Sequence, residues 1–244
     1  MKRTEARAAA LLTLSFTAYA FASPYEIEST DIDDGIELRT GAYYHGTGKE
    51  HVITPTVELE TSVGRDLELE ASADYGRTLQ ESGAPRAGIH RTLEMKWRFL
   101  RGDQSAVSLA AIPELTVPVH DSSGQPNQSS MELELPFVVQ KRLDEWTLDA
   151  RIGYGRTLES SGEDFIPTGV LIRYRATRRL EIGAELVGEA PRRHLEDLTL
   201  SVNAGFNWIV TEWLEFEGLL GMTIRNQTPE DGRVKMTLAA VIQL

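Results

Sequence analysis

Hydrophobic and polar residues alternate along most of this chain, from Leu67 to its end. The stretch 67–76 reads LELEASADYG and the stretch 198–208 reads LTLSVNAGFNW, with an apolar residue at nearly every second position. A period of two puts successive side chains on opposite faces of a β-strand, so each strand has one apolar and one polar face. Strands of this length, joined by alternately short and long connections, predict a transmembrane β-barrel.

The pattern predicts an all-β fold, a closed antiparallel barrel of twelve strands over residues 35–244. The expected strands are 35–45, 51–62, 66–78, 88–100, 105–119, 130–141, 145–157, 165–176, 179–188, 197–209, 212–225 and 233–244. Connections within successive pairs are long and those between pairs are short. An even number of strands places both termini and all short turns on the periplasmic side.

Aromatic residues agree with this topology, because Trp and Tyr favour the two membrane–water interfaces. The four tryptophans fall at the short-turn ends of strands and four tyrosines at the long-loop ends: Trp97, Trp146, Trp208 and Trp213, and Tyr43, Tyr44, Tyr75 and Tyr154. Five prolines within the expected strands remove ladder donors, so we expect bulges or breaks near them: Pro55, Pro113, Pro118, Pro136 and Pro167.

Residues 1–22 have the features of a cleavable secretory signal peptide. A basic start with Lys2, Arg3 and Arg7 precedes an apolar stretch, 8–20, and an Ala-Phe-Ala sequence at 20–22. This stretch is too short, and wrongly flanked, for a membrane helix. Its removal takes away three positive charges and one negative charge, which changes the formal net charge from −12 to −14. We expect 23–34 to be a periplasmic N-terminal segment.

Composition narrows the functional classes. The chain has no apolar run long enough for a membrane-spanning helix, and it has no cysteine, so a disulfide framework is excluded. Its acidic balance argues against nucleic-acid binding, which requires basic patches. No metal or cofactor site is expected. The expected partners are outer-membrane lipid, an unidentified small solute, and the barrel-assembly machinery during biogenesis.

Several stretches resemble the MetA-pathway phenol-degradation family of outer-membrane proteins. They include 53–60 (ITPTVELE), 93–100 (LEMKWRFL), 112–118 (IPELTVP), 133–137 (LELPF) and 180–186 (LEIGAEL), in matching order over about residues 52–225. The resemblance implies a barrel that carries small, often aromatic, compounds across the outer membrane. Barrels of this kind usually end on an aromatic residue, whereas this chain ends on Leu244.

If the apolar parity faces lipid, the polar parity lines the lumen, because a carboxylate on the lipid face is costly and a basic side chain at the membrane midplane costs about 2–4 kcal/mol. The lumen-lining candidates are Glu58, Glu68, Glu70, Glu94, Lys96, Glu132, Glu134, Asp149, Arg151, Glu181, Glu185, Glu215 and Glu217, together with Glu60, Glu114, Arg98, Arg173 and Lys235. The excess of acids predicts a cation-preferring pore. The same residues, if paired with Arg and Lys, are equally consistent with a closed structural or surface-binding barrel.

Catalytic alternatives are weak. A lipid-modifying enzyme requires a Ser–His pair, and the best candidate is His120 with Ser122, Ser123, Ser129 or Ser130. Residues 31–35 (DIDDG) resemble half a calcium loop but lack the downstream Glu, residues 46–49 (GTGK) lack P-loop spacing, and Arg101-Gly102-Asp103 lies on an expected periplasmic turn. A soluble exported β-sandwich is a further alternative. The favoured function is passive uptake of small solutes through an acidic lumen in the bacterial outer membrane, without catalysis.

Overall fold

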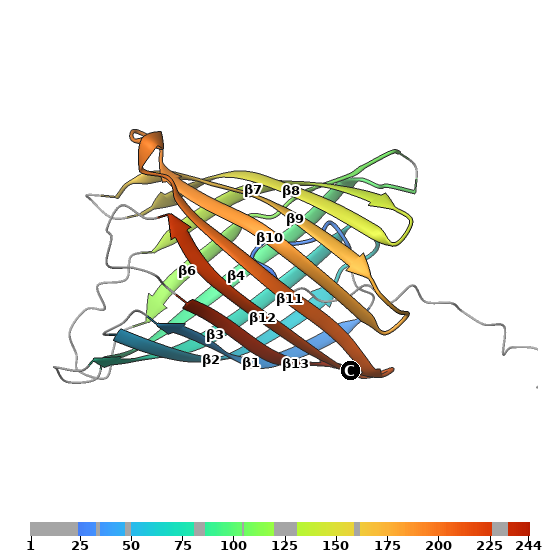
Figure 1. Ribbon diagram of the computed structural model, residues 1–244, viewed down its shortest axis with the longest axis horizontal. Helices are drawn as coiled ribbons and strands as arrows, with labels where there is room; N and C mark the ends of the chain where they lie inside the picture. Colours follow the sequence, from blue (N-terminus) through green and yellow to red (C-terminus); the bar gives the residue numbers. More distant parts are fainter. Residues whose placement is uncertain are drawn as a thin grey trace, which may run out of the picture.

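The computed structural model describes residues 24–32, 35–46, 50–80, 86–103, 105–119, 131–158, 162–225 and 234–244. These residues form a closed antiparallel barrel of twelve strands, as the alternation predicts (Figure 1). The labels run to β13 because one of the twelve strands is divided into two segments, β5 and β6. The barrel is closed because the first strand, β1 (Ile36–Gly46), pairs with the last, β13 (Val234–Gln243), as well as with β2 (Glu50–Ser62). A soluble β-sandwich is therefore wrong for this chain.

The remaining strands follow the expected ranges to within a few residues. They are β3 (Leu67–Gln80), β4 (Arg86–Leu100), β5 (Ser108–Ala111), β6 (Glu114–Val119), β7 (Glu132–Leu143), β8 (Trp146–Thr157), β9 (Asp164–Arg175), β10 (Leu180–Pro191), β11 (Thr199–Thr211) and β12 (Leu214–Arg225). If β5 and β6 are counted as one strand, each strand pairs with its neighbours along the chain, so the topology is a simple meander closed on itself. A single short 3-10 helix (Leu195–Asp197) lies between β10 and β11 in the described part.

One barrel strand is divided in two at a proline. β5 and β6 lie in line between β4 and β7, and both pair with these two strands. Ile112 and Pro113 separate them, since Pro113 has no N–H for the ladder. The backbone N–H of Ile112 still donates to the Pro136 carbonyl at 3.0 Å, and the Met95 N–H donates to the Pro113 carbonyl at 3.0 Å. The wall therefore stays connected across the break.

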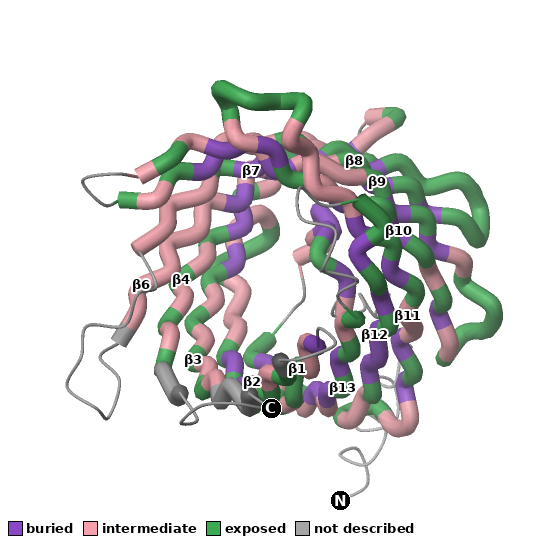
Figure 2. The backbone as a smooth tube through the Cα atoms, turned by 60° about the vertical axis from the view of Figure 1, so that its left-hand side comes forward, coloured by how far each residue is buried: buried purple, intermediate pink, exposed green. Residues whose placement is uncertain are grey.

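The alternation separates an apolar outer face from a polar inner face. In β4, the outward residues Leu93, Met95, Trp97 and Phe99 are 57%, 37%, 53% and 46% exposed, whereas the inward residue Lys96 is 6% exposed. Figure 2 shows the sheet curled into a ring, with buried positions alternating along the strands. An apolar outer band of this kind is what hydrocarbon requires of a barrel wall. No helix among the described residues is long and apolar enough to cross a membrane.

Candidate channel lumen

A continuous row of glutamates crosses the inner wall. Six residues on six neighbouring strands stand directly opposite one another in the sheet: Glu37 in β1, Glu60 in β2, Glu70 in β3, Glu94 in β4, Glu114 in β6 and Glu134 in β7. Directly paired residues of an antiparallel sheet lie about 4.5–5.5 Å apart at their Cα atoms. We call these six residues the carboxylate row.

The row climbs the height of the wall. Glu37 is the second residue of β1, at the end where the short turns lie, and Glu134 is the third residue of β7, which follows a long outer connection. Barrel strands are tilted by roughly 35–45°, so a line of residues drawn across them rises as it goes round. The carboxylate row therefore connects the two ends of the lumen.

Within the described part of the chain, Glu37, Glu114 and Glu134 of the row have specific partners, but Glu70 and Glu94 do not. Glu37 accepts a hydrogen bond from Gln243, and Glu134 forms an ion pair of 2.6 Å with Arg151. Glu114 accepts a hydrogen bond of 3.0 Å from Thr116. Glu70 and Glu94 have no hydrogen bond or ion pair with any residue that the structure describes. The two central carboxyl groups thus have no cationic partner among the described residues.

The nearby cationic side chains are occupied by other carboxylates. Lys96 forms ion pairs with Glu68 and, at 3.3 Å, with Glu28. Arg39 forms ion pairs of 2.8 Å with Glu58 and 3.2 Å with Glu217. These pairs hold the acidic wall together but supply no cation to Glu70 or Glu94.

On the opposite wall, the buried charged side chains are paired with one another. Arg173 in β9 lies between Asp149 of β8 and Glu181 of β10, at 3.1 and 3.3 Å, and all three side chains are almost fully buried. Buried charges of this kind are tolerated only when they are paired. This network braces the wall and is not available to a solute.

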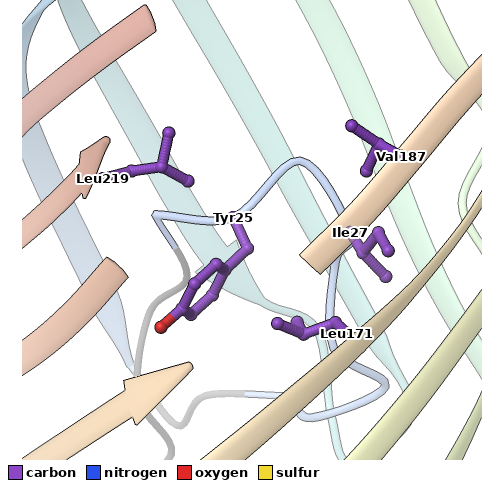
Figure 3. Packing of buried hydrophobic residues seen from close by; sticks show 5 residues of the cluster. All are labelled: Tyr25, Ile27, Leu171, Val187 and Leu219. Atoms are coloured by element: carbon purple, nitrogen blue, oxygen red, sulfur yellow. The ribbon is translucent and has the colours of Figure 1, made fainter. Parts of the chain in front are cut away.

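The N-terminal segment lies inside the barrel, which corrects the expected periplasmic location of 23–34 for its described residues, 24–32. Tyr25 and Ile27 are 4% and 0% exposed, and they form an apolar cluster with Leu171, Val187 and Leu219 from the inner faces of β9, β10 and β12. Figure 3 shows these five side chains from close by, among the surrounding strands. Burial of Tyr25 and Ile27 gives the segment a fixed place in the lumen, with about 1.5–3 kcal/mol of favourable free energy for an aliphatic side chain such as Ile27.

Inward-facing glycines make room for this segment. A Cβ on Gly169 of β9 would lie 2.7 Å from the Ile27 Cδ1 atom, and one on Gly183 of β10 would lie 2.6 Å from the Tyr25 hydroxyl oxygen. A Cβ on Gly205 of β11 would lie 2.9 Å from a ring carbon of Tyr25. Three neighbouring strands therefore form a recess shaped to these two side chains.

Polar contacts fix the segment along its length. The Glu185 carboxylate accepts from the backbone N–H groups of residues 26 and 27 at 3.0 and 3.1 Å, and Lys235 forms an ion pair of 2.7 Å with Glu26. Thr30 donates to Gln140 at 2.9 Å, and Asp31 forms an ion pair with Arg142. Burial alone raises the pKa of Asp31, but the charges of Arg142 and Arg173 outweigh it, so this pKa lies below its ordinary value.

A cavity of about 400 Å³ lies between the segment and the acidic wall. Its lining on the wall includes Glu58, Glu70, Asp74, Glu94 and Glu114, with Arg39 and Lys235 as the basic residues. The N-terminal segment supplies Tyr25 and Glu26 to the other side. The interior therefore holds a space for a small solute in which acids outnumber bases.

The structure places the predicted lumen residues on the inner parity of their strands. Glu58, Glu68, Lys96, Asp149, Glu181, Glu185 and Glu217 are buried there, while Glu70, Glu94, Glu132, Glu134, Arg151 and Glu215 are partly exposed. They do not form one ring. Glu70 and Glu94 belong to the carboxylate row, whereas Asp149 and Glu181 belong to the Arg173 network and Glu185 holds the N-terminal segment.

Most of the aromatic residues expected at the interfaces are exposed or lie on the outward parity of their strands, whereas Tyr43 does not. Trp97, Trp146, Trp208, Trp213 and Tyr75 are 47–56% exposed, and Tyr154 lies on the outward parity of β8. Tyr43 instead lines the interior cavity. It has the same parity as Arg39 in β1, so its side chain turns inward although it sits near the strand end.

Sequence reasoning missed the residues that receive the N-terminal segment. The available signal was a local exception to the pattern, namely apolar residues at inward positions (Leu171, Val187 and Leu219) and inward glycines on adjacent strands. The enzymatic candidate His120 and its serines at 122, 123 and 129–130 lie outside the described residues, as do 33–34 and 47–49 of the other two motifs.

Comparison with known proteins supports the fold. No family model and no curated protein matches the chain. Among solved structures, an outer membrane channel from Pseudomonas putida F1 matches with a TM-score of 0.64 and 13% identity, over 91% of this chain and 100% of that one. The NanC porin has a TM-score of 0.64 at 6% identity over 85% and 100%, and the KdgM porin in complex with disordered oligogalacturonate has 0.61 at 9% over 84% and 99%. These identities are low, so the likeness concerns the fold.

Proposed function

We propose that this protein is an outer-membrane channel that admits small solutes passively and prefers cations. The observation that carries the proposal is the carboxylate row, whose central members face a cavity in the lumen. Charged side chains that line a pore bias which ions enter it. The matched channel and porin structures support a transport role, since they share the architecture around a lumen.

The solute class draws support from the sequence. The resemblance to the MetA-pathway phenol-degradation family favours small organic compounds, including aromatic ones. An acidic lumen adds a preference for those that carry positive charge. Neutral aromatic solutes are compatible with the same channel, because Tyr25, Tyr43 and Leu219 line the cavity beside the acids.

Reversal potentials in planar bilayers test the proposal. We expect the mature protein to pass current under a potassium chloride gradient with a reversal potential of the sign given by cation preference. The double variant Glu70→Gln/Glu94→Gln should lose much of that preference, because it removes the two unpartnered carboxylates.

The matched control is Glu145→Gln, which removes a carboxylate from the exposed turn between β7 and β8. It should behave as the unaltered protein does. Anion preference, or the same reversal potential in all three proteins, would contradict the proposal.

A second candidate function is a closed barrel that acts through its outer loops. It is favoured by the N-terminal segment, which fills part of the lumen, and by the buried Arg173 network. Under this alternative the protein should insert into bilayers without conductance, and deletion of residues 24–32 should leave it silent as well.

A further inference from the structure

The outer face of the wall has an apolar depression that the proposed channel function does not use. It has a volume of about 490 Å³ and lies across the strands from β2 to β7. Ala71 of β3 stands directly opposite Leu59 of β2 on one side and Leu93 of β4 on the other. These two leucines are 48% and 57% exposed, so the short alanine side chain leaves a hollow between them. We call this depression the outer groove.

The outer groove leads to the long-loop end of the barrel. From Leu93 the line of directly paired residues continues through Leu115 of β6 and Leu133 of β7, and both of these residues line the groove. The next residue in the line is Arg156 of β8. Leu133 is the second residue of β7 and Arg156 is the last but one of β8. The groove therefore ends at the rim where the long connections begin.

Two arginines lie at this end of the groove. Arg156 stands opposite Asp164 of β9, and the backbone N–H of Arg192, directly after β10, donates to the Asp164 carbonyl at 2.8 Å. Both guanidinium groups approach the same Asp164 carboxylate, at 3.8 and 3.2 Å, and both side chains are more than half exposed. A guanidinium group has five N–H donors. One shared carboxylate therefore leaves most of these donors without an acceptor among the described residues.

Arg91 of β4 is an independent sign of an anionic neighbour. It has the outward parity of Leu93, lies two residues nearer the long-loop end, and is exposed. The residues directly opposite it are Ala73 and Val117, and no described residue forms an ion pair or a hydrogen bond with it. An arginine on the lipid-facing side costs about 2–4 kcal/mol at the midplane and much less near the interface. Its guanidinium group therefore requires water or an anion within reach.

The leaflet at this end of the barrel determines what can occupy the outer groove. The long connections of such barrels lie on the extracellular side, so the rim at Arg156 meets the outer leaflet. Lipopolysaccharide, the glycolipid of that leaflet, carries phosphate groups directly above its acyl chains. Arginine binds phosphate through paired N–H donors, and a hydrocarbon chain gains dispersion contacts in a concave apolar surface. An apolar groove that ends at exposed arginines fits both parts of this molecule.

We propose that the outer groove and the arginines at its end form a binding site for lipopolysaccharide. One acyl chain packs in the groove between Leu133 and Ala71, and a phosphate group of the lipid A moiety binds Arg156 and Arg192. Arg91 supplies a further cation beside the groove. The site is on the outside of the barrel, so it does not depend on the proposed channel function.

Native mass spectrometry of the mature protein in detergent micelles tests the site. The protein is mixed with bisphosphorylated lipid A, with the same lipid A after enzymatic removal of its phosphates, and with phosphatidylglycerol, each at the same concentration. We expect bisphosphorylated lipid A to bind at least about tenfold more tightly than the dephosphorylated form, which corresponds to about 1.4 kcal/mol. It should also bind more tightly than phosphatidylglycerol, whose phosphate is not specific to the outer leaflet.

One pair of variants tests the phosphate contacts. Arg156→Gln/Arg192→Gln should abolish the preference for the phosphorylated lipid, because it removes both guanidinium groups at the end of the groove. The matched control is Arg178→Gln/Arg179→Gln, which removes the same charge from the exposed turn after β9 and should keep the preference. Circular dichroism establishes that each variant is folded.

A second pair tests the groove itself. Ala71→Phe fills the hollow between the two leucines and should weaken the binding of both forms of lipid A by about fivefold. Ala204→Phe adds the same ring on the exposed outer face of β11, away from the groove, and should leave binding unchanged.

Three results would overturn the proposal. Equal binding of phosphorylated and dephosphorylated lipid A by the unaltered protein would do so whatever the variants show. Equal losses in Arg156→Gln/Arg192→Gln and in Arg178→Gln/Arg179→Gln would indicate a general effect of charge. Phosphatidylglycerol that binds as tightly as bisphosphorylated lipid A would rule out lipopolysaccharide as the specific occupant.

Discussion

The Cδ1 atom of Ile27, in the N-terminal segment, lies 2.7 Å from the position that a Cβ atom on Gly169 of β9 would occupy. The contact means that a buried apolar side chain fits the wall only because the wall residue is glycine. Its consequence is testable, because any larger side chain at position 169 competes with Ile27 for the same space.

We expect Gly169→Val to displace the N-terminal segment from its recess. Overpacking of this kind costs typically about 1–3 kcal/mol, and release of the segment relieves it. Single-channel conductance should rise relative to the unaltered protein. Ala184→Val, which adds two methyl groups on the exposed outer face of β10, should leave conductance unchanged. Equal conductance of both variants would show that the segment does not restrict the lumen.

Arg173 should be a major determinant of stability. Arg173→Met leaves the buried carboxylates of Asp149 and Glu181 without a counterion, and breaking a buried pair costs about 3–5 kcal/mol. Urea unfolding in lipid vesicles measures the loss. Arg178→Met, in the exposed turn after β9, should cost less than about 1 kcal/mol, as substitutions of exposed charges do. The triple variant Arg173→Met/Asp149→Asn/Glu181→Gln should recover part of the stability. No difference between Arg173→Met and Arg178→Met would contradict this interpretation.

The pairing of Asp31 with Arg142 should make docking of the N-terminal segment sensitive to acid. The folded-state pKa of Asp31 is below its ordinary value, so the contact stabilises the docked state above the unfolded pKa of about 3.9 and is lost as the pH falls through the folded pKa. Asp31→Asn should therefore be less stable than the unaltered protein at neutral pH. The difference should shrink below about pH 4, as unfolding measured across pH would show. A difference that grows on acidification would contradict the assignment.

Two leucines with the same exposed fraction should respond differently to charge. Leu93 on the outer face of β4 and Leu195 in the 3-10 helix are both 57% exposed. Leu93→Arg should destabilise the protein in vesicles by about 2–4 kcal/mol, because an arginine there faces hydrocarbon. Leu195→Arg lies beyond the strands and should change stability by less than about 0.5 kcal/mol. Equal effects would argue against the outer face of β4 lying in the membrane.

The strands and their inward and outward faces could be predicted from sequence because a period of two is a local property. The pattern from Leu67 to Tyr75 determines which side of β3 is polar without reference to any other strand. Pro113 likewise marked a disturbed position, and the structure divides the strand there.

The organisation of the lumen could not be predicted in the same way. Glu70 and Glu94 are recognisable as inward residues, but their direct opposition depends on the register across a long connection, which the sequence does not specify. The docking of residues 24–32 depends on contacts between positions as far apart as Glu26 and Lys235. Tyr43 shows the remaining difficulty, since an aromatic residue near a strand end suits the interface and the lumen equally well.

The ladder between β1 and β13 has a consequence for how the molecule is made. Glu37 and Gln243, which hydrogen-bond across it, are 206 positions apart, so the cylinder cannot be sealed until β13 has been synthesised. Bringing such distant partners together carries a large loop-closure entropy. Until then, the edge strands on both sides of the incomplete sheet have unpaired backbone N–H and C=O groups, which lipid cannot solvate. A chain cut short before Val234 would therefore be left with two open margins, and it should be degraded in the periplasm before it reaches its membrane.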